Sequence, residues 1–124
     1  MKPNKKEKTI RENLKKIQEC DVLQVTFADE TKADCDVICN FLCDNQIVCV
    51  LFSRGEKLES GLLKTYAVFF DPATEEVVLD NEMEEDELNM IRQIMNQNLT
   101  RDDETKTPIC ELVLDEIDEV LFTL

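Results

Sequence analysis

The chain has 124 residues, of which 43% are hydrophobic and 34% are charged, and its formal net charge is −14. This length fits a single domain, and the apolar content is typical of a globular protein rather than a disordered one. The basic start is not followed by an apolar run, which excludes a secretory signal, and no stretch approaches the length of a membrane span. We therefore expect a cytoplasmic protein.

The charge is divided by position along the chain. Residues 1–19 carry a net charge of +4, whereas residues 20–124 carry seven Lys or Arg against twenty-five Asp or Glu, a net charge of −18. A body this acidic repels nucleic acid and anionic membranes, and it attracts basic protein surfaces over roughly 8 Å at physiological salt. The expected partner is a basic protein surface, with no direct contact to nucleic acid or membrane.

The first expected element is an amphipathic helix over residues 9–20. Thr9 and Glu12 have the spacing of a capping box, which satisfies free N–H groups at a helix start. Ile10, Leu14 and Ile17 follow at helical spacing and form one apolar stripe. The lysines then lie on the outer face.

The middle of the chain has the pattern of strands. A β-branched and aromatic run predicts a strand over 22–27. Residues 33–44 fit a helix face or a strand face, but a turn at Asp44 and Asn45 favours strands at 34–43 and 46–53. Pairing Cys43 with Gln46 then produces one apolar face. That face comprises Cys35, Val37, Cys39, Phe41, Cys43, Val48, Val50 and Phe52.

The opposite face of these two strands is also half apolar, with Ile38, Leu42, Ile47, Cys49 and Leu51. Antiparallel sheets with one face in water normally alternate more cleanly. Either helices cover both faces, or a second chain covers one of them.

The remaining elements complete an α+β pattern. Strands are expected at 62–70 and 75–79, and a second capping box, Asn81 with Glu84, opens a helix that ends near residue 98. Thr107 and Pro108 resemble a helix start, and the apolar residues up to Leu124 fall at helical spacing. The fold class is therefore α+β. We expect one domain over 1–124, with an antiparallel sheet of about five strands flanked by an N-terminal helix and two C-terminal amphipathic helices.

Four stretches carry a resemblance to a known family: Val25–Glu30, Cys35–Phe41, Val48–Phe52 and Val77–Ile91. Together they make residues 22–99 resemble the YrzB-like family of short acidic bacterial domains of unknown function. The basic helix in residues 1–20 and the expected helix in residues 105–124 are additions to that pattern. The resemblance implies a small cytoplasmic bacterial accessory protein, and it transfers no catalytic residue.

Acidic side chains are the candidate partner-binding residues. They are Glu82, Glu84, Glu85, Asp86, Glu87, Asp115, Glu116, Asp118 and Glu119. The run from Asp80 to Glu87 does not fit a calcium loop, because it lacks the glycine of the sharp turn and the closing glutamate. The alternative is that these acids only complement the dipole at a helix start.

The sequence contains no motif that indicates catalysis. There is no histidine to serve as the usual general base, and none of the six cysteines forms a close-spaced pair. We expect no catalytic residues, no metal site and no cofactor, with reduced cysteines that are mostly buried.

Three function classes follow from these observations. The favoured class is a non-catalytic acidic interaction module, of which a sharper form is a nucleic-acid mimic that occupies a DNA- or RNA-binding site. The alternatives are a small acidic secretion-type chaperone and a cysteine-based metal or redox protein. The amount of apolar surface also predicts a two-fold homodimer, unless the terminal helices cover both sheet faces within one chain.

Overall fold

The structure, a computed structural model, describes residues 5–43, 46–100 and 107–122. Seven strands, two α-helices and one short 3-10 helix make up this part of the chain. Their bounds are α1 (Lys5–Gln18), β1 (Val22–Phe27), β2 (Lys32–Leu42), β3 (Val48–Ser53), β4 (Leu63–Phe70), β5 (Val77–Leu79), η2 (Asp80–Glu82), α2 (Glu85–Asn98), β6 (Cys110–Leu112) and β7 (Ile117–Leu121). Within the described ranges, no helix combines the length and the apolar content of a membrane span.

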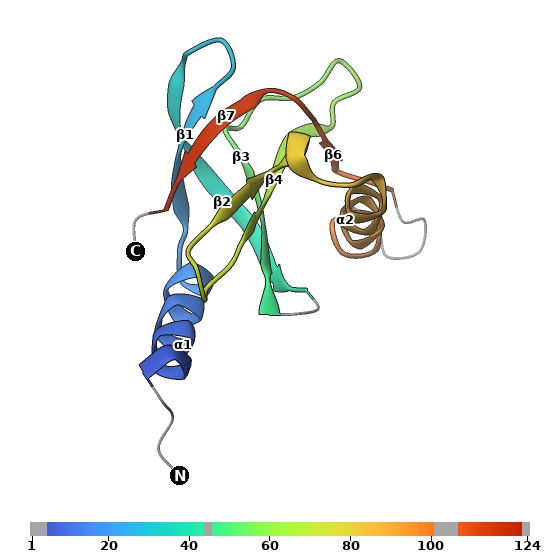
Figure 1. Ribbon diagram of the computed structural model, residues 1–124. Coiled ribbons are helices and arrows are strands. Elements are labelled where there is room, and N and C mark those ends of the chain that lie inside the picture. Colours follow the sequence, from blue (N-terminus) through green and yellow to red (C-terminus); the bar gives the residue numbers. More distant parts are fainter. Residues whose placement is uncertain (1–4, 44–45, 101–106, 123–124) are drawn as a thin grey trace.

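The strands form one strongly curled sheet (Figure 1). Its order is β5-β4-β3-β2-β1-β7, and each neighbouring pair is antiparallel. Strand β6 lies parallel to the first part of β4, whereas β5 pairs with the last part of β4. Because the curl brings β5 towards β7, the sheet is a nearly closed barrel.

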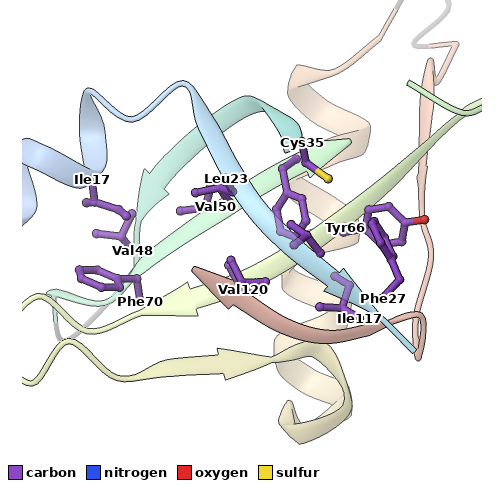
Figure 2. Close-up of a cluster of buried hydrophobic side chains, with 13 residues drawn as sticks. Ile17, Leu23, Phe27, Cys35, Val48, Val50, Tyr66, Phe70, Ile117 and Val120 are labelled. Carbon is purple, nitrogen blue, oxygen red and sulfur yellow. The ribbon is translucent and has the colours of Figure 1, made fainter. Parts of the chain in front are cut away.

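The inside of the barrel holds one of two apolar clusters. Figure 2 shows its side chains in a row, from Ile17 and Phe70 at one end to Phe27 and Tyr66 at the other. Ile17 comes from the last turn of α1, so this helix closes one end of the barrel. Its amphipathic stripe therefore has a structural role, although most of the helix projects away from the barrel (Figure 1).

The second cluster lies on the outside of the barrel, beneath α2. Leu88, Ile91 and Met95 of this helix are buried against Leu51 and Ala67, and β6 contributes Cys110 and Leu112. All six residues of β3 are consequently buried, because one face lines the barrel and the other lies under α2. The two apolar faces expected from the sequence are thus covered within one chain by the barrel itself and by α2.

The expected sheet of about five strands with three helices is wrong. The described part of the chain has seven strands and two α-helices, and the region assigned to a C-terminal helix forms β6 and β7. Cys110 and Leu112 alternate with exposed Glu111, and a left-handed Asp115 (φ 66°) interrupts any helix. The free edges of β1 and β4 accept the two strands, so backbone pairing outweighs the helical spacing of the apolar residues.

The expected pairing of β2 with β3 is confirmed where Asp36 and Val37 lie opposite Ser53 and Phe52, and it is wrong by one residue beyond them. Phe41 lies opposite Cys49, and a bulge between Val37 and Cys39 makes Ile38 an extra residue. Since side chains alternate between the two faces, the bulge moves the later part of β2 to the other side of the sheet. Cys35 and Val37 belong to the inner cluster, whereas Cys39, Phe41 and Cys43 pack in the outer one. The turn expected at Asp44 and Asn45 lies outside the described residues.

The second helix begins later than its sequence predicts. Residues 80–82 form η2, and α2 starts at Glu85. The capping box is made by Glu84 and Glu87 rather than by Asn81 and Glu84. In it, the backbone N–H of Glu84 donates a hydrogen bond to Oε1 of Glu87 at 2.9 Å. An acidic residue thus takes the position that the pattern assigned to Asn81.

Candidate functional site

Asp80, which precedes α2, and Asp115 of the β6–β7 turn meet at one place. The buried Asp80 in η2 accepts a hydrogen bond through Oδ2 from the backbone N–H of Asp115, at 3.1 Å. This bond holds the turn against η2, which precedes α2, although the two segments are 35 residues apart. We name the resulting surface the acidic ridge, and it comprises Glu82, Glu84, Glu85, Asp86, Glu87 and Asp115.

Several acids of the ridge also support the local backbone. Oε2 of Glu82 accepts a hydrogen bond from the N–H of Leu79 at 3.2 Å, and Glu87 has the capping role described above. Glu85 forms an exposed ion pair with Arg92 at 3.5 Å. Capping and the helix dipole therefore account for the acids of the first turn of α2, including Asp86, and they do not explain the exposed side chain of Asp115.

The other predicted acids do not join the ridge as one patch. Glu116 is half-buried and lies 3.6 Å from Nζ of Lys64, which also approaches Glu56 at 3.7 Å. Glu119 lines a groove of about 420 Å³ over β1, β2 and β7, together with Lys32 and Asp34. Asp118 is exposed on β7. The structure therefore brings Asp115 to Asp80 in η2, next to the α2 acids, and places Glu119 in a different groove.

Asp80 is an unusual member of this region because it is almost completely buried. Its side chain is 2% exposed, and within the described residues Oδ1 has no hydrogen-bond partner. Burial raises the pKa of this carboxyl, although the N–H of Asp115 opposes the shift. Asp80 thus keeps the ridge together at a cost in solvation free energy.

A second polar group, not expected from the sequence, closes the barrel end opposite α1. The guanidinium of Arg54 lies 4.1 Å from the ring centroid of Phe27 and forms an ion pair with Glu56. The Tyr66 hydroxyl beneath it is buried and has no hydrogen-bond partner among the described groups. Burial, followed by the charge of Glu116, raises the pKa of Tyr66 to about 12. No sequence pattern marks this group, since Arg54 follows an apolar strand in an ordinary loop.

The cysteines are free thiols distributed over both clusters. Burial raises the pKa of Cys35 to about 11, and it also raises the pKa of Cys39, Cys49 and Cys110. A thiol with a raised pKa is a weak nucleophile at neutral pH. Within the described ranges, no group of three or more Cys, Asp, Glu or His side chains is arranged to hold a metal ion.

Comparisons with family models, with curated proteins and with solved structures found no match to this chain. The resemblance to the YrzB-like family therefore stays a prediction from the residues. The function has to be inferred from the surface of the molecule itself.

Proposed function

We propose that this protein is a non-catalytic, cytoplasmic interaction module whose acidic ridge docks on a basic protein surface. The carrying observation is the hydrogen bond from Asp115 to Asp80, which joins acids from two distant segments into one surface. A surface of like charges held in fixed positions steers a basic partner and accelerates its association.

The charge balance of the ridge supports this role. In the described part of the chain from residue 20 onward, the carboxylates in ion pairs are Glu56, Glu85 and Glu116. Of these only Glu85 belongs to the ridge, and its partner Arg92 is itself partly exposed. The ridge therefore keeps most of its negative charge available to a partner. The raised thiol pKa values support the non-catalytic part of the proposal, because they weaken the cysteines as nucleophiles.

The test compares two charge reversals of equal size. The variant E85K/D86K changes exposed acids of the ridge, and the control D34K/D36K changes exposed acids on β2. Partners are captured from cell extract, identified, purified, and their association rate is measured at low and high salt. We expect the ridge variant to slow association by about tenfold at low salt, and the control to have a much smaller effect.

The proposal fails if both variants slow association equally, because net charge alone would then explain the binding. It also fails if the rate does not respond to the ridge reversal or to salt. Circular dichroism and thermal melting establish that both variants are folded. A small loss of stability is expected in E85K/D86K, because lysines oppose the dipole at a helix start.

A further inference from the structure

The N-terminal helix α1 carries a second surface, which the barrel does not cover. Its last turn is buried through Ile17, but Ile10 and Leu14 are only half-buried. Leu42, at the end of β2, is 53% exposed. Ile10, Leu14 and Leu42 line a groove of about 400 Å³, together with Glu7, Arg11 and Gln46.

Basic side chains flank this groove. Lys8, Arg11 and Lys15 are exposed and recur at i, i+3 and i+7, so they form one row along α1, and Arg11 of this row lines the groove. The groove itself is lined by one acid, Glu7, and one base, Arg11, and the basic row runs along its side. The complement of this basic row is a strongly acidic surface.

The chain itself provides such a surface, at the opposite end of the molecule. In Figure 1, α1 extends below the barrel, whereas η2 and the start of α2 lie near the top right. Asn13 of α1 donates a hydrogen bond to the carbonyl of Pro72 at 3.0 Å, which helps to fix the helix at its end of the barrel. Consequently α1 does not reach the acidic ridge of its own chain.

We propose that the basic row of α1, beside this groove, docks on the acidic ridge of a second copy of this chain. In an antiparallel pair related by a two-fold axis, each basic helix lies at the ridge of the other copy, and the two equivalent contacts close the assembly. This inference rests on the proposed recognition role of the ridge and names the surface that it recognises. The charge division of the sequence, +4 before residue 20 and −18 after it, then sets both halves of the interface.

A charge-swap experiment tests the pairing. The variants K8E/K15E and E85K/D86K each reverse one side of the interface, and D34K/D36K is the matched control for the second. Mass is measured by sedimentation velocity and light scattering over a wide concentration range at low and high salt. We expect wild type and the control to have about twice the monomer mass of 14.4 kDa at low salt, and the wild type to dissociate at high salt.

Each reversal alone should weaken self-association by about tenfold or more, because attraction is replaced by repulsion. An equimolar mixture of the two reversed variants should again associate, since a reversed helix then has a reversed ridge as its partner. If either double variant is unfolded by circular dichroism, its single reversal, Lys15→Glu or Asp86→Lys, replaces it. Each single reversal changes one exposed side chain, so it should weaken association while the fold persists.

Self-docking is refuted if the wild type stays at 14.4 kDa throughout, or if the mixed variants fail to associate. A dimer that ignores both reversals refutes it as well. The outcome for the ridge is separate. If the wild type is monomeric but E85K/D86K still loses a partner captured from extract, the ridge has its proposed role and the second copy is not its target. If that partner binding is also unaffected, both proposals are wrong.

Discussion

Asp80 offers the sharpest test of how the acidic ridge is held together. Its side chain is 2% exposed, and Oδ2 accepts the backbone N–H of Asp115 at 3.1 Å. Asp80→Ala removes this acceptor and leaves a partly buried N–H unpaired, which costs about 1–3 kcal/mol. Asp80→Asn keeps an oxygen acceptor of nearly the same shape and removes the charge. We therefore expect the alanine variant to be about 1–3 kcal/mol less stable than the asparagine variant at pH 7.

The pH dependence of Asp80 has a defined sign. Burial raises the folded pKa of this carboxyl above its unfolded value, so the folded state binds the proton more tightly. The stability contributed by protonation is fully present below the unfolded pKa and is lost as the pH rises through the folded pKa. The nearby charge of Asp115 acts in the same direction. Wild type should therefore gain stability relative to Asp80→Asn as the pH falls from 7 through the carboxyl range.

Urea unfolding of wild type, Asp80→Ala and Asp80→Asn at several pH values measures both the stability differences and their pH dependence. At pH 7 the asparagine variant should equal or exceed the wild type, because it avoids the burial of a charge. Equal stability of the alanine and asparagine variants would show that the bond to Asp115 does not stabilise the fold. A wild type that loses stability relative to Asp80→Asn on acidification would refute the raised pKa.

Two further predictions concern the core and the thiols. Ile91→Ala on α2 and Ile117→Ala on β7 should each lower the free energy of unfolding by about 2–5 kcal/mol in urea titrations, because both side chains are buried. A loss below about 1 kcal/mol for Ile117→Ala would contradict the placement of β7 against the barrel interior. In thiol labelling of the native protein, the partly exposed Cys20 should react first, and the fully buried Cys35 and Cys49 should react only on unfolding. Rapid labelling of all six cysteines would contradict the packing of both clusters.

The sequence predicts the early strands well because their pattern is local. Alternation over 22–27 and the apolar run at 46–53 predict strands that the structure contains as β1 and β3. The helix expected to end near residue 98 is also present as α2, and its apolar residues Leu88, Ile91 and Met95 are buried at helical spacing. In each case the apolar residues follow one period, and the side chains at that period are the ones that the fold buries.

The sequence fails where pairing partners decide the structure. Residues 109–121 have helical spacing, but β6 and β7 form because β4 and β1 present free edges that are distant in the sequence. The bulge at Ile38 is likewise not predicted by the alternation of side chains along a regular strand. It places Cys39 and Cys43 in the outer cluster. Both errors arise from long-range backbone pairing, which local periodicity does not report.

The candidate site is predicted in part for the same reason. The acids of Glu82–Glu87 can be found from their density, but their union with Asp115 depends on a buried hydrogen bond across 35 residues. Glu119 also belongs to a dense run of acids in the sequence, but it lies in a different groove. Charge counting therefore finds the kind of surface, and only the fold decides which acids belong to it.

The position of Asp80 bears on whether the acidity serves recognition or only solubility. Solubility needs exposed charge, and exposed charge does not require a fixed arrangement. Asp80 is a buried carboxyl with a raised pKa, and within the described residues its Oδ1 has no hydrogen-bond partner, so at neutral pH the fold is less stable than it would be with an uncharged asparagine at this position. The same residue makes the hydrogen bond that holds the β6–β7 turn at η2, just before α2. A ridge fixed in this way loses less conformational entropy on binding than a set of independently moving acids, and this is the property that a docking surface uses.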